Sequence, residues 1–127
     1  MDGKMAKISE AEKNIMRILW EAGTPVTSNG VMELCKKEKQ WKITTVLTFL
    51  SRLIEKGMVS YEKKGKTNFY RANITAERYA RLEAKKYLDM EYNGSLSSFV
   101  ATLYHGENMP KEDIEQLREW LDEQEGT

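Results

Sequence analysis

The hydrophobic pattern of the chain changes from helical to strand-like at Gly57, and this change constrains the fold more than any other feature. Before it, apolar residues recur every three or four positions over Lys42–Lys56, the spacing of an amphipathic helix. After it, two runs of β-forming residues, 58–62 and 67–72, flank the basic, glycine-centred turn Lys63–Lys66. The sequence therefore predicts a helix that leads directly into a β-hairpin with a basic tip.

Two further helices are predicted upstream of the hairpin. Ser9 and Glu12 have the spacing of a capping box at the start of the first helix, which Gly23 ends. A shorter second helix begins at Thr27, and Pro25–Val26 could add a short strand to the sheet. Three helices followed by a two-stranded hairpin are the order of a winged helix-turn-helix. The expected fold is therefore mainly α with a small β-hairpin wing.

A helical tail follows the hairpin. A long helix is predicted over Thr75–Tyr92, Asn93–Gly94 breaks it, and two more amphipathic helices follow, the last starting at Pro110. About fifty residues are too few for a strong core of their own. The apolar stripes of the tail therefore need another surface, either the winged domain or the tail of a second copy.

We favour the second copy, because DNA-binding domains of this type commonly pair to match two half-sites. We accordingly expect residues 1–73 to form a DNA-binding domain and residues 74–127 to form a helical dimerisation domain. The apolar residues expected in the dimer core are Leu96, Phe99, Val100, Leu103, Ile114, Leu117 and Leu121.

The formal net charge of the chain is zero, but the charges are unevenly distributed. Residues 1–73 hold 14 Lys and Arg against 8 Asp and Glu, and residues 74–127 hold 6 against 12. A basic half followed by an acidic half favours nucleic-acid binding by the basic part. A small asymmetry can also arise by chance, so charge alone leaves this function open.

Composition argues against a membrane or secreted protein. No apolar run approaches the roughly 18 residues that cross a bilayer, and the N-terminus lacks the apolar stretch of a secretion signal. The single cysteine, Cys35, cannot form an intrachain disulfide and is expected to be a small buried apolar residue. We therefore expect a cytoplasmic protein with no membrane partner.

Nothing in the sequence indicates catalysis. His105 is the only histidine, no His, Cys and acidic residues have the spacing of metal ligands, and no glycine-rich loop follows a strand. Trp20 and Trp41 are expected to pack in the protein rather than to stack on bases. We expect no enzyme, no cofactor and no metal.

The order of several short motifs resembles one protein family over nearly the whole chain. These motifs are Ile8–Glu12, Ile18–Trp20, Trp41, Thr44–Thr48, Leu50–Gly57, Tyr61, the turn around Gly65, Phe69–Tyr70 and Asn93–Leu96. In this order they are similar to the BlaI/MecI/CopY family of bacterial winged-helix repressors, also called the penicillinase-repressor family. The resemblance implies a homodimer that binds a palindromic operator in double-stranded DNA and blocks transcription, as regulators of β-lactam resistance genes do.

The resemblance also implies two kinds of release from DNA. Copper-responsive members bind metal through a C-terminal cysteine cluster. This chain lacks such a cluster, so we do not expect copper to release it from DNA. In β-lactam-responsive members, a membrane sensor triggers proteolysis in the dimerisation segment. Alignment from Asn93–Gly94 places the corresponding bond near Thr102–Leu103, where the best-known members have Asn-Phe. Because this chain differs there, proteolysis is a hypothesis, with a sensor or protease as the implied partner.

Candidate DNA-contacting residues lie on the third helix and on the wing. The major groove admits a helix and presents a distinct pattern for each base pair, so the outward polar face of the helix would meet base edges. Lysines on the wing and just before the helix would contact phosphates. The alternative is that these side chains are ordinary solvated ones. The candidates are Lys42, Thr44, Thr45, Thr48, Arg52, Lys63, Lys64 and Lys66.

Two other functions are compatible with the same fold. One is a protein-interaction subunit without sequence-specific DNA binding, which the basic wing and the polar helix face disfavour. The other is a repressor of unrelated genes that a small molecule releases, for which the sequence shows no obvious ligand site.

Overall fold

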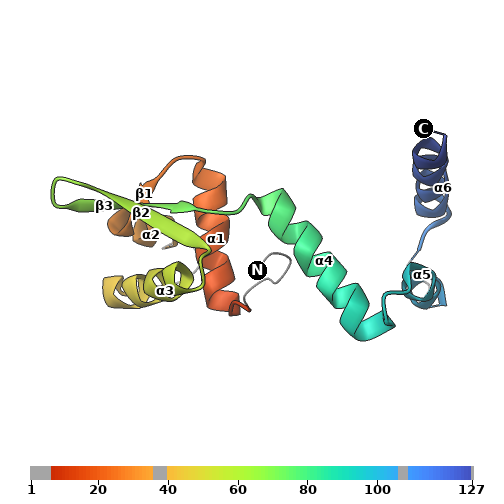
Figure 1. The fold of residues 1–127 in the computed structure, drawn as a ribbon, viewed down its shortest axis with the longest axis horizontal. Coiled ribbons are helices and arrows are strands. Elements are labelled where there is room, and N and C mark those ends of the chain that lie inside the picture. Colours follow the sequence, from red (N-terminus) through yellow and green to blue (C-terminus); the bar gives the residue numbers. More distant parts are fainter. Residues whose placement is uncertain (1–6, 36–39, 106–108, 127) are drawn as a thin grey trace. The chain divides into compact units, whose positions relative to one another are not determined.

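Three helices and a three-stranded sheet form the N-terminal part of the computed structural model, which describes residues 7–35, 40–105 and 109–126 (Figure 1). These elements are α1 (Glu10–Ala22), β1 (Val26–Thr27), α2 (Ser28–Cys35), α3 (Ile43–Glu55), β2 (Val59–Lys64) and β3 (Thr67–Ala72). The helices that follow are α4 (Ala76–Tyr92), α5 (Leu96–His105) and α6 (Lys111–Glu125). The predicted fold class, mainly α with a small β-hairpin wing, is confirmed.

Both ends of α1 are fixed by the residues that the sequence indicated. The Ser9 hydroxyl accepts a hydrogen bond from the Glu12 backbone N–H at 3.1 Å, and the Glu12 carboxylate accepts one from the Ser9 N–H at 3.0 Å. Gly23 ends the helix with a left-handed φ of 70°, which glycine adopts at little cost. The predicted capping box is confirmed.

The turn from α3 into the wing is a Schellman motif. The Met58 N–H donates to the Leu53 carbonyl at 2.9 Å, and the Gly57 N–H donates to the Ile54 carbonyl at 3.0 Å. Gly57 has a φ of +77°, which side chains disfavour. Because Met58 is buried, this turn also fixes the start of the hairpin against the core.

The sheet has the strand order β1-β3-β2, with both pairs antiparallel. The short strand lies one residue later than predicted, because Val26 and Thr27 pair with Tyr70 and Phe69. The basic turn is also shorter than predicted. Lys63 and Lys64 pair with Asn68 and Thr67 and so belong to β2, which leaves Gly65 and Lys66 as the loop. Of these two, only Gly65 has a positive φ, as in a type II′ turn.

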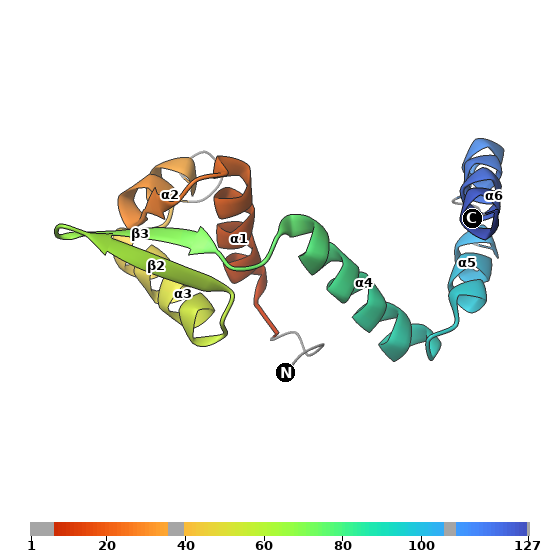
Figure 2. The same cartoon turned by 45° about the horizontal axis from the view of Figure 1, so that its top comes forward.

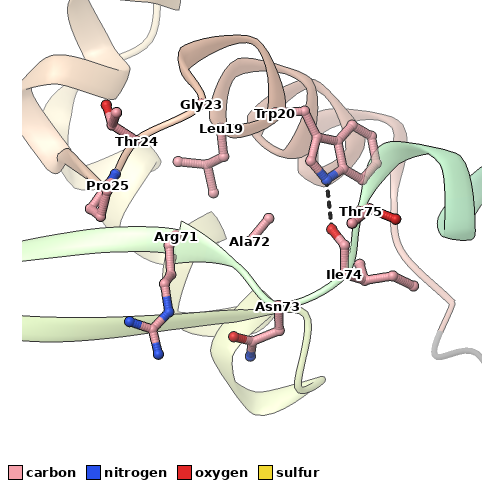
Figure 3. A pocket seen from close by; sticks show the side chains of 10 residues that line it. All are labelled: Leu19, Trp20, Gly23, Thr24, Pro25, Arg71, Ala72, Asn73, Ile74 and Thr75. Carbon is pink, nitrogen blue, oxygen red and sulfur yellow. Dashed lines mark hydrogen bonds between the residues drawn. The ribbon is translucent and has the colours of Figure 1, made fainter.

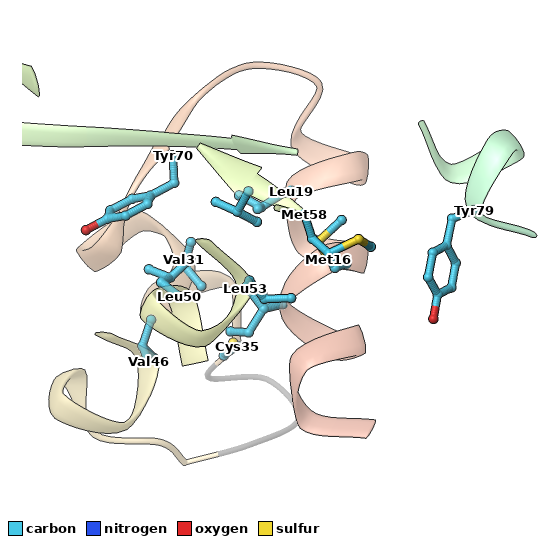
Figure 4. Packing of buried hydrophobic residues seen from close by; sticks show 12 residues of the cluster. Met16, Leu19, Val31, Cys35, Val46, Leu50, Leu53, Met58, Tyr70 and Tyr79 are labelled. Carbon is cyan, nitrogen blue, oxygen red and sulfur yellow. The ribbon is translucent and has the colours of Figure 1, made fainter. Parts of the chain in front are cut away.

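The core lies where α1, α2 and α3 meet the sheet (Figure 4). Its buried side chains are Ile15, Met16, Leu19, Val31, Cys35, Val46, Leu50, Leu53, Met58, Val59, Tyr70 and Tyr79. Cys35 is buried, as predicted. Trp41 packs against Phe49 with ring centroids 5.2 Å apart, so its predicted packing role is also confirmed.

The beginning of α4 is attached to α1. The Trp20 indole N–H donates to the Ile74 carbonyl at 2.8 Å, and the Trp20 ring lies 5.6 Å from that of buried Tyr79. Lys13 pairs with Glu83 at 2.8 Å. Burial, together with the neighbouring Glu83 carboxylate, raises the pKa of Tyr79 to about 12, so this phenol stays neutral at physiological pH.

The chain divides into two compact units within α4, after Glu83. We call the first of them, up to Glu83, the winged unit. This division describes packing. The predicted boundary after residue 73 concerns which residues contact DNA and which form a dimer, and it stays a prediction. None of the helices in the described ranges has the length and hydropathy needed to span a bilayer.

The second unit contains the end of α4, α5 and α6. Asn93 and Gly94 both have positive φ values, 51° and 78°, and separate α4 from α5, which confirms the predicted break. Tyr92 and Phe99 pack edge to face across this turn at 5.2 Å. From Ala84 onward no described residue is buried, so the apolar faces of this unit lie open in the single chain.

Candidate nucleic-acid interface

One face of α3 is buried and the opposite face is free. Val46, Leu50 and Leu53 point into the core with 1% exposure or less. Thr44 and Thr48, on the opposite face, are exposed. Helical periodicity produces this division, and the core contacts fix which way the polar face points.

The Thr48 hydroxyl has a defined hydrogen-bonding role. It donates to the Thr44 carbonyl at 2.9 Å, one turn earlier in the helix. A hydroxyl has one proton, so the outward-facing lone pairs of Thr48 can only accept. Thr45, also predicted to contact DNA, is half-buried and less accessible than its two neighbours on this face.

Arg52 and Lys42 lie at the two ends of α3. Arg52 is exposed, and its guanidinium carbon lies 6.0 Å from the centre of the Phe49 ring, close enough for a cation–π contact. Lys42 is the exposed N-cap residue, with extended backbone and no side-chain capping bond. Both cationic side chains are therefore accessible to a ligand that approaches the face of α3 on which the threonines lie.

The wing presents its lysines on more than one face. Lys63, Lys64 and Lys66 are all exposed. Because Lys63 and Lys64 are consecutive in β2, their side chains point to opposite faces of the hairpin, and the Lys64 ammonium lies 5.7 Å from the centre of the Phe69 ring. The tip of the hairpin projects beyond α2 and α3 in both views (Figures 1 and 2). The basic charge is therefore carried away from the core.

Sequence reasoning missed one exposed residue on α3. Leu47 is 39% exposed and lies three residues after Thr44 and four before Ser51. These separations place the three side chains along one stripe of the helix. The spacing was available from the sequence, but an apolar residue in an otherwise polar stripe was not counted among the contacts.

A buried carboxylate links the start of α1 to the end of α3. Glu12 is 2% exposed, and its Oε1 accepts from the Lys56 ammonium at 2.6 Å as well as from the Ser9 N–H. Burial by itself would raise the pKa of Glu12. The hydrogen bonds from Lys56 and Ser9 outweigh burial, and the pKa lies below its ordinary value.

The predicted dimerisation residues lie on α5 and α6, and all are at least partly exposed. Phe99, Val100, Ile114 and Leu117 are half-buried, whereas Leu96, Leu103 and Leu121 are exposed. The candidate cleavage position Thr102–Leu103 lies inside α5, where the Thr102 hydroxyl donates to the Ser98 carbonyl at 2.9 Å.

A cleft of about 350 Å³ lies beside Trp20, between the end of α1 and the end of β3 (Figure 3). The Trp20 N–H is already bonded to Ile74, and the side chains of Arg71 and Asn73 point away from the indole. Asn73 is also engaged with Ser60 and with the Gly57 carbonyl. Specific ligand sites combine apolar walls with converging polar groups, which this cleft lacks. This cleft, taken by itself, therefore gives no support to release by a small molecule.

Comparison with known proteins gives consistent matches. The chain matches the penicillinase repressor family over residues 8–123. It is 31% identical over 120 residues to the penicillinase repressor of Bacillus licheniformis, covering 94% of this chain and 93% of the relative. It is 28% identical over 121 residues to the methicillin resistance regulatory protein MecI of Staphylococcus aureus strain N315, covering 95% and 98%.

Part of the chain also matches a solved structure. This is the monomeric form of Bacillus licheniformis BlaI in complex with the blaP half-operator, with a TM-score of 0.51 and 33% identity. The match covers 60% of this chain and 92% of that one.

Proposed function

The chain belongs to the penicillinase repressor family, and from this premise we propose that it is a homodimer that binds a palindromic DNA operator and represses transcription. Proteins of this family are repressors of the BlaI/MecI type, not enzymes, and carry a DNA-binding winged helix. We propose a cytoplasmic location as well, because a repressor has to reach the DNA that it binds. The target genes are set by the operator sequence.

The observation that carries this proposal is the combination of a free polar face on α3 with a projecting basic wing. The same fold, at 33% identity, is bound to a half-operator in BlaI. In our proposal α3 enters the major groove, where Thr44, Thr45 and Thr48 meet base edges. Phosphates are contacted by the cationic side chains Lys42, Arg52, Lys63, Lys64 and Lys66.

Dimerisation is assigned to residues 74–127. The apolar side chains of α5 and α6 are exposed or half-buried in the single chain, and covering them with the same surface of a second copy would remove them from water. Two winged domains held in this way would match two half-sites related by a two-fold axis.

Release by proteolysis near Thr102 and Leu103 is part of the same proposal. Because this bond lies within α5, a protease that acts on extended chain would reach it only when the helix opens locally. Cleavage there would cut the proposed dimer core, and the separated winged domains would bind DNA more weakly, since the second half-site is no longer held nearby.

The experiment that tests this function is a mobility shift with DNA from upstream of the protein's own gene. The DNA is titrated with salt and with competitor DNA, and the mass of the bound species is measured. Saturable binding by a dimer that resists competitor supports the proposal. Weak binding that salt abolishes, with no preferred sequence, contradicts it and favours a protein-interaction role for the winged helix.

A further inference from the structure

The first half of α3 exposes side chains that carry methyl groups. Thr44 and Thr48 are exposed, and between them Leu47 is 39% exposed although its neighbours Val46 and Leu50 are buried. Leu47 thus adds little to the core of the winged unit and presents an apolar side chain to solvent. In a winged helix that binds DNA, this part of the helix is the one that meets base edges.

Hydrogen-bonding readers of bases are scarce on this helix. Bidentate contacts require Arg or Lys for guanine and Asn or Gln for adenine. Within Ile43–Glu55 there is no Lys, Asn or Gln, and the single Arg, Arg52, lies in the last turn beside Phe49. The Thr48 hydroxyl donates its proton to the Thr44 carbonyl, and while it does so it has no proton for a base.

The geometry therefore points to readout by apolar contact. The feature of the major groove that an apolar side chain recognises is the C5-methyl group of thymine. We propose that Leu47 is a specificity-determining residue that packs against a thymine methyl group in each half-site. This inference rests on the proposed DNA-binding function and deepens it by stating which base the first half of α3 selects.

The test begins with full-length protein and a pool of randomised duplexes, from which bound sequences are enriched. In the enriched duplex, each thymine of the half-site is then replaced by deoxyuridine, which lacks only the methyl group. At one thymine this change should weaken binding of the wild-type protein by about fourfold, the loss expected for one buried methyl-sized group. The same change should have no effect on binding of the Leu47→Ala variant.

A matched control comes from another exposed leucine of the winged unit. Leu34 on α2 is 52% exposed, so Leu34→Ala removes the same atoms from a position off the α3 face. This variant should respond to deoxyuridine as the wild-type protein does. Thermal unfolding of both variants should match the wild type, since neither leucine is buried.

The outcomes separate the two proposals. If a half-site is enriched but no thymine shows a methyl effect that depends on Leu47, the inference about Leu47 is wrong and the DNA-binding function stands. If a half-site is enriched without thymine, the inference is wrong as well. If no sequence is enriched, the proposed function fails and the inference fails with it.

Discussion

At the scale of single residues, Glu12 connects the capping of one helix to the placement of another. Its carboxylate closes the capping box of α1 and also holds Lys56, the residue that ends α3. Among the described residues it is the one charged side chain that is buried. A buried charge is tolerated when it is paired and hydrogen-bonded, and here both partners are present.

The first prediction follows from this pairing. Glu12→Gln keeps the shape of the side chain and an acceptor for the Ser9 N–H but loses the ionic partner of Lys56. We expect a loss of about 1.5–3 kcal/mol in the free energy of unfolding at pH 7, the range for a hydrogen bond to a charged group. Urea unfolding of both proteins measures this difference.

The lowered pKa of Glu12 also predicts how the stability difference between the two proteins changes with pH. The pKa of Glu12 is lowered in the folded protein, so its ionic contribution is present above an ordinary glutamate pKa of about 4.3 and is lost as the pH falls through the folded value. The stabilities of wild type and Glu12→Gln should therefore converge below about pH 4.

Exposed Glu10, in the same helical turn, supplies the control Glu10→Gln, for which we expect a change under about 0.5 kcal/mol in the free energy of unfolding. A difference that persists unchanged at low pH would assign the loss to packing rather than to charge.

At the scale of elements, the wing and α3 divide the proposed contacts with DNA. Lysines that contact phosphates release counterions and position the protein, whereas residues in the groove select the sequence. The lysines of the wing lie on both faces and at the tip of a hairpin that projects from the core. The wing should therefore contribute to affinity and its salt dependence more than to sequence preference.

Replacing Lys63, Lys64 and Lys66 together by alanine tests this division. If each contacts one phosphate, the slope of log K against log salt should become less steep by up to about 2.7, from roughly 0.9 per contact. The preferred sequence should stay the same. A triple change of Lys85, Lys86 and Lys111 to alanine alters the net charge equally from positions beyond the winged unit. Equal changes of slope in both triple variants would show that the lysines of the wing do not contact DNA.

Local signals determined which elements could be predicted from the sequence. The ends of α1, the turn at Gly57 and the break at Asn93–Gly94 depend on residues within one turn of chain, and all three were confirmed. The extension of β2 to Lys64 depends on pairing across the hairpin, and the burial of Glu12 depends on Lys56, 44 residues away. Such long-range contacts leave no local pattern, which is why the sequence did not indicate them.

The candidate interface shows the same limit. The outward position of Thr44 and Thr48 follows from the apolar stripe alone, but the hydrogen bond that makes Thr48 an acceptor follows from the folded helix. Leu47 belongs neither to the apolar stripe expected for this helix from the sequence nor to the expected DNA contacts. Its spacing from Thr44 is visible in the sequence, but the extent of its exposure follows only from the folded structure.

At the scale of the whole molecule, the two parts of the chain differ in both charge and packing. The part up to Glu83, with 16 Lys and Arg against 10 Asp and Glu, contains every buried residue that the structure describes, and the part after Glu83, with 4 against 10, contains none. Its exposed apolar side chains include Leu96, Trp120 and Leu121. A segment this small cannot form a strong core alone, so its apolar area is better explained by a surface that a second chain covers.

The last prediction tests that explanation through Leu103, which lies on α5 among the expected dimer residues. Leu103→Asp would place an unpaired charge in an apolar interface, and we expect dimer dissociation to become easier by on the order of a hundredfold or more. Light scattering should then show monomers, and operator affinity should fall because the two half-sites are no longer bound together. The control Leu34→Asp makes the same change at an exposed leucine of α2, outside residues 74–127, and should leave a dimer. A stable dimer of Leu103→Asp would instead place the interface away from α5, and it would leave the exposed apolar side chains of this helix to be covered by a different partner.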